Sequence, residues 1–325
     1  MGDPAGVGPE LCLRALADRE LSEVAHLVVF GDLAVLRHCA AVVGLPEPRR
    51  VIQENRWPDV CKKLDEPALL DIRGFDALGF EPGKVSGKTG AAAYRYIKKS
   101  ISAALDRQID AVVTAPINKE ALHAAGVDFP GHTEIFAAET RARKACMFQY
   151  SQEVRASFVT VHVGYHEVPH LLSVDRIMDV IELTAAALQR INGRPARLAV
   201  LGLNPHAGEN GLFGNREEER FIIPAIQLAK KKGYDVEGPL PPDTAFIPAK
   251  RKVIDGFICM YHDQGHIPLK ALAFDSAVNT TLGLPIIRTS VDHGTACDIA
   301  WQGKADPGSL FSAVRLAAKL SSPVK

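Results

Sequence analysis

The sequence lacks an excess of charge of either sign. Its 325 residues include 38 Lys and Arg and 38 Asp and Glu, so the formal net charge is zero. A protein that binds nucleic acid or an anionic membrane through a basic surface normally carries excess positive charge. The balance therefore argues against both kinds of partner, and an apolar content of 47% excludes intrinsic disorder. The length suits one large or two medium domains.

Long apolar runs and closely spaced cysteines are also missing. No run approaches the roughly 18 apolar residues that a membrane span needs. The opening MGDPAGVGPE has neither the basic nor the apolar stretch of a signal peptide. No cysteines form a CxxC pair, so we expect free thiols in a reducing cytoplasm rather than disulfides or a zinc ribbon. The six are Cys12, Cys39, Cys61, Cys146, Cys259 and Cys297.

What the sequence does contain is an alternation of short apolar runs with longer helical patterns. The predicted strands are residues 26–30, 110–114, 154–163, 197–203, 254–260 and 285–289. The predicted helices are residues 9–17, 34–43, 89–107, 118–125, 134–138, 174–191, 216–232 and 310–320. Near-continuous apolar strands that alternate with helices predict an α/β protein with a largely parallel sheet covered on both faces. Residues 46–83 carry no clear pattern.

Three histidines, His162, His206 and His262, each follow a predicted strand. Ligands of parallel sheets collect outside the carboxyl ends of the strands, so these imidazoles could meet at one edge. Three neutral imidazoles with open positions suit a catalytic divalent metal ion. The alternative is three ordinary histidines that each hydrogen-bond locally. The long gaps, which contain no pattern such as HExxH, do not decide between the two.

Arg288 lies within a predicted apolar strand, where an unpaired guanidinium would be costly. It therefore requires an anion, which is either a ligand or the carboxylate of Asp292 or Asp298. Lys270 and Asn279 precede it in the same part of the chain. An arginine, which can donate two parallel hydrogen bonds to an anion, next to a positively charged lysine favours the binding of a phosphate.

Two further loops lead into predicted helices. In the first, Thr133 either caps the helix or offers its hydroxyl to a substrate, and His132 is an exposed-loop candidate for binding a carboxylate. The second is the glycine-rich segment 2–10, which is either an anion cradle at a helix N-terminus or a tight turn with close backbone packing. It is not a GxGxxG fingerprint, and no strand precedes it. We therefore expect the intact protein to have an extended N-terminus.

Taken in order, the motifs resemble the 4-hydroxythreonine-4-phosphate dehydrogenase family. The matching segments are GDPAGVGPE, PGHTE, NPHAGENGLFG, GPLPPDT, YHDQGHIPLK and LPIIRTSVDHGTACDIAWQGKAD, which together extend from Gly2 to about Asp306. In addition, the segment 293–300 is similar to the nucleotide-binding loop of isopropylmalate and isocitrate dehydrogenases, which share a fold with this family.

The resemblance implies two α/β/α lobes around a central cleft, as in isocitrate and isopropylmalate dehydrogenases. Residues 1–130 plus 271–325 would form the nucleotide-side lobe, and residues 131–270 the metal- and substrate-binding, dimerising lobe. It also implies a homodimer with the active site at the interface and one metal ligand from the partner chain. The implied cofactors are NAD and one divalent metal ion per site, which could be Zn, Mg, Co or Mn.

The resemblance also assigns residues, position by position. The metal ligands would be His162, His206 and His262. The substrate contacts would be His132, Thr133, Lys270, Asn279 and Arg288. The nucleotide loop would contribute His293, Gly294, Thr295 and Asp298. The general base stays open: Lys119, Asp243 and Asp263 are candidates, and each could instead be a structural partner.

The implied reaction is oxidation, with decarboxylation, of a 4-phosphorylated C4 hydroxy acid. Segments 118–123, 209–214, 265–268 and 298–301 are more like the branch acting on 4-phospho-D-threonate or 4-phospho-D-erythronate than the pyridoxine-biosynthesis branch. Three alternatives remain: a phosphate acyltransferase-like transferase, a non-catalytic sugar-phosphate binder, and a dihydrodiol dehydrogenase. The expected phosphate site disfavours the last.

Overall fold

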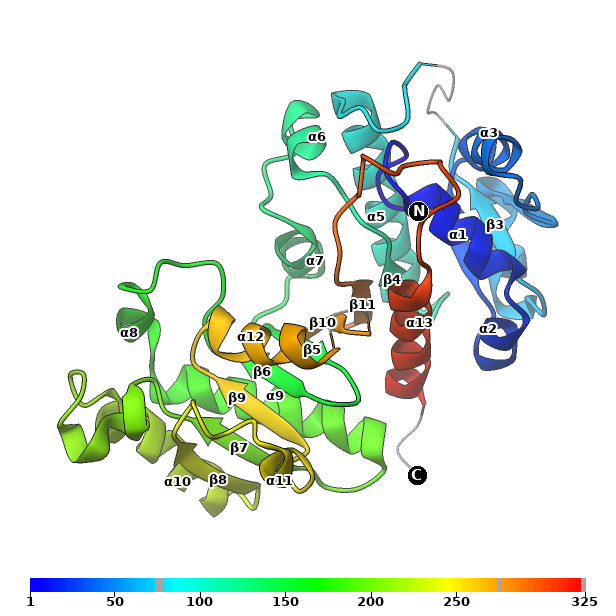
Figure 1. Cartoon of the computed structure of the whole chain (residues 1–325). Helices are drawn as coiled ribbons and strands as arrows, with labels where there is room; N and C mark the ends of the chain where they lie inside the picture. The colour runs from blue at the N-terminus through cyan, green and yellow to red at the C-terminus, as the bar shows by residue number, and fades with distance from the viewer. Residues whose placement is uncertain (74–78, 274–275, 323–325) are drawn as a thin grey trace. The chain divides into compact units, whose positions relative to one another are not determined.

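The computed structural model describes residues 1–73, 79–273 and 276–322, and they form two compact units (Figure 1). Unit 1 comprises residues 1–142 and 284–321, and unit 2 comprises residues 143–283 with Ser322. The family resemblance implied unit boundaries after residues 130 and 270. They fall later because the next helix, α7 (His132–Thr140), packs on a unit 1 helix, and the strand β10 (Val278–Leu282) pairs within unit 2.

Unit 1 is built on short parallel strands. Its strands are β1 (Val28–Gly31), β2 (Arg50–Gln53), β3 (Ala68–Asp71), β4 (Ala111–Thr114) and β11 (Ile287–Val291). Its helices are α1 (Gly8–Ala17), α2 (Arg19–Val24), α3 (Leu33–Val43), α4 (Trp57–Val60), α5 (Gly87–Leu105), α6 (Lys119–Ala124), α7 and α13 (Gly308–Ser321), with 3-10 turns η1 (Glu54–Arg56) and η2 (Cys61–Lys63). β1, β3 and β2 form one parallel sheet in that order, and β4 pairs in parallel with β11.

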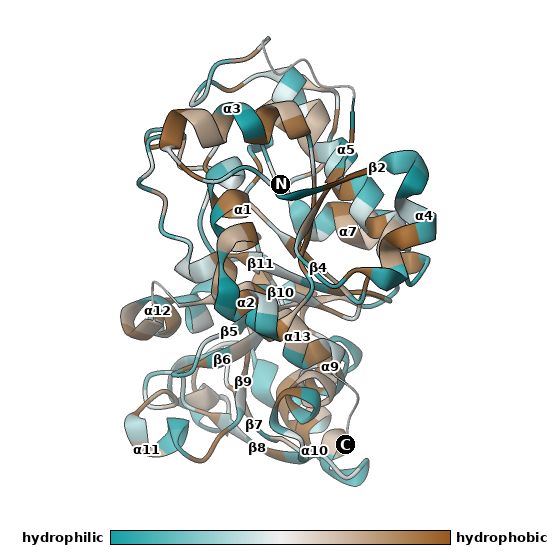
Figure 2. Cartoon of the chain, turned by 90° about the vertical axis from the view of Figure 1, so that its right-hand side faces the viewer, coloured by the Kyte–Doolittle hydropathy of each residue, from teal (hydrophilic) through white to brown (hydrophobic). Residues whose placement is uncertain are grey.

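Helix starts in unit 1 follow the capping residues of the sequence. The Asp32 carboxylate accepts from the Ala34 N–H at 2.9 Å and begins α3, a mostly apolar helix with a short polar stretch in its middle (Figure 2). Asn118 caps α6 in the same way, accepting from the Ala121 N–H at 2.9 Å. Residues 46–83, for which the sequence analysis made no assignment, supply β2 and β3. Each of these strands has only four residues, too few to show a period.

Unit 2 contains a six-strand arrangement in the order β10-β5-β6-β9-β7-β8. Besides β10, the strands are β5 (Cys146–Tyr150), β6 (Arg155–Phe158), β7 (Arg197–Leu201), β8 (Asp235–Leu240) and β9 (Gly256–Cys259). The helices are α8 (Val168–Leu171), α9 (Val174–Asn192), α10 (Ile223–Lys231), α11 (Pro248–Arg251) and α12 (His262–Ala273), with a 3-10 segment η3 (Pro205–Gly211) and a π-turn η4 (Glu218–Ile222). α9 and α12 pack on opposite faces of these strands (Figure 1).

The expectation of a largely parallel sheet needs correction in unit 2. β6, β9, β7 and β8 are parallel, but β5 runs antiparallel to both of its neighbours, β10 and β6. The sequence prediction missed β5 and β10. The four-residue connection from β5 to β6 allows only an antiparallel hairpin, because a parallel crossover needs a dozen or more residues.

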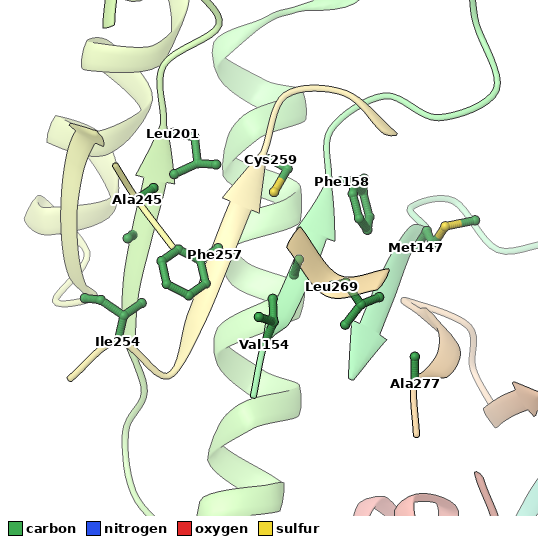
Figure 3. Packing of buried hydrophobic residues seen from close by; sticks show 12 residues of the cluster. Met147, Val154, Phe158, Leu201, Ala245, Ile254, Phe257, Cys259, Leu269 and Ala277 are labelled. Carbon is green, nitrogen blue, oxygen red and sulfur yellow. The ribbon is translucent and has the colours of Figure 1, made fainter. Parts of the chain in front are cut away.

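The core of unit 2 lies beneath α12. Phe158, Phe257 and Cys259 at the centre are at most 1% exposed, and Leu269 of α12 packs onto them (Figure 3).

The six cysteines of the chain are free. Among the described residues, no helix combines the length and apolarity required for a membrane crossing.

A buried carboxylate joins the start of β7 to the loop before β9, and it gives a first testable prediction. Asp255, 8% exposed, accepts two hydrogen bonds from the Arg194 guanidinium at 2.7 and 2.8 Å and one from the Arg197 N–H at 2.8 Å. Burial raises the pKa of Asp255, but these hydrogen bonds outweigh it and the net pKa is lowered. The stabilisation is therefore present above the unfolded pKa of about 3.9 and is lost as the pH falls through the folded value.

We expect Asp255→Asn to lower the free energy of unfolding at pH 7 by about 1–2 kcal/mol, because Arg194 is partly solvated. The difference from the wild type should shrink below about pH 4. Glu153→Gln, which removes a more exposed unit 2 carboxylate, is the control and should stay within about 0.5 kcal/mol. Urea unfolding followed by circular dichroism at pH 7 and pH 3.5 measures both. An equal difference at the two pH values would contradict the prediction.

Candidate functional site

The three predicted histidines of unit 2 follow three adjacent parallel strands. β9 lies between β6 and β7 and is parallel to both, so the carboxyl ends of these strands are at one edge. His162 follows β6, His262 follows β9 and His206 follows β7. The ring centroids of His162 and His262 are 5.7 Å apart. His162 and His206 are exposed, and the His262 side chain is 39% exposed.

A carboxylate orients the His262 ring. His262 Nδ1 lies 2.7 Å from Asp263 Oδ1, and the Tyr165 hydroxyl donates to Asp263 Oδ2 at 2.5 Å. These hydrogen bonds lower the pKa of Asp263. Because an ionised carboxylate only accepts, Nδ1 carries the hydrogen, which turns Nε2 away from Asp263. A carboxylate behind an imidazole is the usual partner of a metal-ligating histidine.

His206 opens a segment with unusual backbone geometry. Residues 206–210 all have positive φ, from 41° to 80°, although only Gly208 among them is a glycine. Such a run of left-handed residues costs free energy and requires support from the surrounding structure. The His206 ring lies against Phe213, with centroids 6.1 Å apart.

The support is a buried carboxylate that the sequence analysis missed. Glu218 is 1% exposed, and its Oε1 accepts from the backbone N–H groups of Leu203 and Asn204, both at 2.9 Å. Its Oε2 accepts from the Asn204 side chain at 3.0 Å. A Cβ at Gly208 would lie 2.6 Å from Glu218 Oε2, so the turn is folded tightly over this carboxylate. No local pattern in the sequence marks Glu218, because its partners lie about 15 residues earlier.

The donor set at this edge fits a divalent metal ion. Imidazoles that are accessible, neighbouring and in one case oriented by a carboxylate are typical of zinc and related ions. Within the described ranges of a single chain, no group of three or more His, Cys, Asp or Glu side chains is close enough to hold a metal ion. In one chain, two of the three predicted ligands, His162 and His262, lie next to each other. The third, His206, follows the end of the adjacent strand β7.

Unit 1 contains a buried cation. Arg288 of β11 is 2% exposed, and its Nη2 donates to Thr114 Oγ1 of the paired strand β4 at 2.8 Å. Its guanidinium also lies over the Phe136 ring, 5.5 Å from the centroid. Burial lowers the pKa of Arg288 to about 9, and the charge of Glu134 opposes that shift. Asp298, one of the alternative partners expected from the sequence, is exposed.

His132 and Thr133 form the first turn of α7, which excludes one of the two alternatives for Thr133 and corrects the expectation for His132. The N-cap is Gly131, so Thr133 is not the cap, and His132 is not in an exposed loop. His132 Nε2 is buried and has no hydrogen-bond partner among the described residues. Burial, with the charge of Arg288, holds the pKa of His132 well below 6.5, so the ring is neutral at pH 7.

These features have a chemistry that suits an anion. No side chain caps the N-terminus of α7, so its first N–H groups are available to a ligand. A helix N-terminus beside a buried arginine favours a phosphate or carboxylate. The neutral His132 can add a hydrogen bond from the atom that now has no partner.

The other two predicted substrate contacts belong to unit 2. Lys270 is half-buried on α12, and burial lowers its pKa. Asn279 lies on β10, and its Oδ1 is buried without a hydrogen-bond partner among the residues the structure describes. The five predicted contacts are thus divided between the units.

The predicted nucleotide loop packs on the glycine-rich opening of the chain. The Thr295 carbonyl accepts from the Val7 N–H at 3.0 Å, and a Cβ at Gly6 would lie 2.9 Å from Thr295. Residues 2–10 are buried, so the opening segment is a closely packed turn and the anion-cradle alternative was wrong. His293, Gly294 and Asp298 are exposed, and a Cβ at Gly294 would meet nothing within 4 Å.

The candidate general bases have different surroundings. Lys119 is exposed at the start of α6 in unit 1, and Asp243 is exposed between β8 and α11 in unit 2. Asp263 is already the acceptor of the His262 and Tyr165 hydrogen bonds. Tyr165 itself was missed, because it lies almost 100 residues from Asp263 and no motif links them.

A two-unit α/β fold with polar side chains at strand ends is typical of enzymes that act on small ligands. Residues 23–317 match the family model described as pyridoxal phosphate biosynthetic protein PdxA, and the chain belongs to this family. This confirms the resemblance seen in the sequence motifs.

Relatives over nearly the full length are named as dehydrogenases. The chain is 44% identical over 326 residues to D-threonate 4-phosphate dehydrogenase of Pectobacterium atrosepticum, covering 99% of this chain and 98% of that protein. It is 45% identical over 328 residues to 4-hydroxythreonine-4-phosphate dehydrogenase of Desulfosudis oleivorans, covering 98% and 93%. The crystal structure of 4-hydroxythreonine-4-phosphate dehydrogenase from Klebsiella pneumoniae has a TM-score of 0.86 and 41% identity, covering 99% and 98%. The family is thus one of dehydrogenases, which implies a nicotinamide cofactor.

Proposed function

We propose that this protein oxidises and decarboxylates a 4-phosphorylated C4 hydroxy acid, namely 4-phospho-D-threonate or 4-phospho-D-erythronate. The observation that carries the proposal is the position of Arg288 in unit 1, where it is almost fully buried and lies near α7, whose N-terminus has no side-chain cap. A phosphorylated substrate carries a charge that a buried guanidinium and a helix N-terminus favour. The dehydrogenase names of the full-length relatives support the reaction type.

Overall identity does not choose between the two substrate classes of the relatives, because it is 44–45% for both. The lean towards phosphorylated threonate or erythronate rests on segments 118–123, 209–214, 265–268 and 298–301. The second candidate is 4-hydroxythreonine 4-phosphate, which the relative from Desulfosudis oleivorans favours.

The proposed reaction oxidises the hydroxyl carbon beta to the carboxylate. Its hydride passes to NAD⁺, its hydroxyl proton passes to a base, and the resulting ketone loses CO₂ to leave an enolate that takes up a proton. When bound, a divalent metal ion lowers the pKa of a coordinated hydroxyl and polarises the ketone, and NAD⁺ accepts the hydride. His162, His206 and His262 would hold the metal ion.

The chain's own residues position the substrate in this proposal. Arg288, the first turn of α7 and neutral His132 would hold the phosphate, and Lys270 and Asn279 remain candidate substrate contacts, as the family resemblance implies. The exposed loop at His293–Asp298 contacts the nucleotide. We further propose that two copies form a homodimer, in which a second copy completes the metal-ligand set that one chain brings together only in part.

An NAD-reduction assay tests the proposal. Metal-stripped protein is supplied in turn with Zn²⁺, Mg²⁺, Mn²⁺ or Co²⁺, and NADH absorbance is followed with the three candidate substrates. Turnover of phosphorylated threonate or erythronate at a kcat/KM at least tenfold above that of 4-hydroxythreonine 4-phosphate is the expected result. The reverse order would establish the second candidate. Ligand binding without NADH formation, or acyl transfer to phosphate, would place the protein among the binders or transferases.

Replacement of Arg288 tests the phosphate site directly. Arg288→Ala removes a charge-assisted hydrogen bond worth about 1.5–3 kcal/mol, so KM for the phosphorylated substrate should rise about 10–100-fold. The value of kcat should fall less. Arg315→Ala, which removes a partly exposed arginine of the same unit, serves as the control and should leave KM unchanged. Arg288→Lys keeps the charge and should recover part of the loss. An unchanged KM in both Arg288 variants would contradict the assignment.

A further inference from the structure

We infer that His266 is a positioning residue for His262 and holds the ring of this proposed metal ligand in place. The inference rests on the proposed metal site and adds a residue that acts through the ligand. His266 lies one turn after His262 on α12, so the two side chains share a face of the helix. Their ring centroids are 3.8 Å apart, and the ring planes differ by 12°.

The stack continues into the core of unit 2. The other neighbour of His266 is the Phe158 ring, at 4.6 Å between centroids and 23° between planes. Phe158 is fully buried at the end of β6 (Figure 3), and His266 is 8% exposed. The 39% exposed His262 side chain is therefore supported by two rings of increasing burial.

Both ring nitrogens of His266 have hydrogen-bond partners. Nδ1 lies 2.9 Å from the His262 carbonyl oxygen, and because that oxygen only accepts, Nδ1 carries the hydrogen. Nε2 therefore accepts, and the Gln149 amide nitrogen, 3.1 Å away on β5, donates to it. Gln149 is 0% exposed. A ring held at both nitrogens has one orientation, so it presents a fixed face to the His262 ring stacked on it.

The neighbouring glycine permits this arrangement. A Cβ at Gly265 would lie 2.7 Å from a Phe158 ring atom and 2.8 Å from Cys259 Sγ, so only glycine lets α12 approach the sheet this closely. An aliphatic residue at position 266 could fill the same space without requiring a buried polar partner. The paired imidazole therefore points to orientation of His262 rather than to filling of the core.

Cobalt binding to the metal-stripped, full-length protein tests the inference. Cobalt reports its ligand geometry through its visible absorption spectrum, and titration gives its Kd. His266→Leu should weaken cobalt binding about 10–100-fold, the usual effect of losing a residue that orients a ligand, and should change the spectrum. Gln149→Leu keeps the His266 ring but removes its donor, so it should act in the same direction.

Leu188→Ala is the control for a purely structural loss. Leu188 packs against Gly256, at the end of β9 remote from His262, so this variant should lower Tm and leave the cobalt spectrum and Kd unchanged. Wild-type cobalt spectra and affinities in both His266→Leu and Gln149→Leu would overturn the inference.

His262→Ala separates failure of the inference from failure of the proposed function. If His262→Ala binds cobalt as tightly as the wild type, the proposed metal site is wrong and the inference falls with it. If His262→Ala loses cobalt while the His266 and Gln149 variants keep wild-type binding, the metal site stands and the positioning role alone is overturned.

Discussion

Replacing His206 with alanine is expected to abolish NAD reduction and to weaken divalent-metal binding by more than about 100-fold. Loss of a residue that only orients a ligand costs 10–100-fold in affinity, so loss of a ligand should exceed that range. The fold should survive, because His206 is exposed and its ring lies against Phe213, which is itself 37% exposed. Metal content by elemental analysis, the NADH assay and circular dichroism measure the three outcomes.

His170→Ala is the matched control, because His170 is an exposed histidine of the same unit on α8. It should retain wild-type metal content and turnover. Full activity in His206→Ala, or in metal-stripped protein without added metal, would rule out the metal mechanism. Wild-type metal binding with no turnover in His206→Ala would exclude His206 as a ligand.

Glu218→Ala is the second change for which we expect a large effect, both on stability and on catalysis. It leaves the buried N–H groups of Leu203 and Asn204 without their acceptor, and each such loss costs about 1–3 kcal/mol. We therefore expect the free energy of unfolding to fall by about 3 kcal/mol. The left-handed turn that begins at His206 also loses its support, and a displacement of about 1 Å could reduce kcat about 100-fold.

Glu209→Ala makes the same deletion at an exposed position of that turn and should change stability by no more than about 0.5 kcal/mol. Urea unfolding and steady-state kinetics compare the two variants. Equal stability of Glu218→Ala and Glu209→Ala would show that the buried carboxylate does not hold the segment. A Glu218→Ala protein that is destabilised but has unchanged kcat would show that the turn keeps its geometry without it.

The sequence predicted the long elements well and the short ones badly. The helix expected over residues 174–191 is α9, capped by Ser173 as its pattern indicates, because 19 residues give a clear apolar period. β2 and β3 were missed because four-residue strands show no period. β5 and β10 were missed as well, which hid the antiparallel part of unit 2.

The candidate site was predictable where its residues stand at strand ends. His162, His206 and His262 follow strands recognisable from their apolar runs, and the sheet places those strands side by side. Residues that hold another side chain or a loop in position could not be found in this way. Glu218, Tyr165 and Gln149 are selected by contacts with residues 14 to 117 positions away, which no local pattern records.

By itself, the sequence determined the α/β class, the family and the residue types that its chemistry needs, because apolar periodicity and ordered motifs are local properties. The tertiary structure decided that residues 2–10 are a packed turn rather than an anion cradle, since burial depends on what lies against them. It also decided that His132, whose Nε2 is buried, is neutral near Arg288. The balanced total charge gave no sign of these local sites, because partners and pKa values follow from distances that a one-dimensional sequence does not contain.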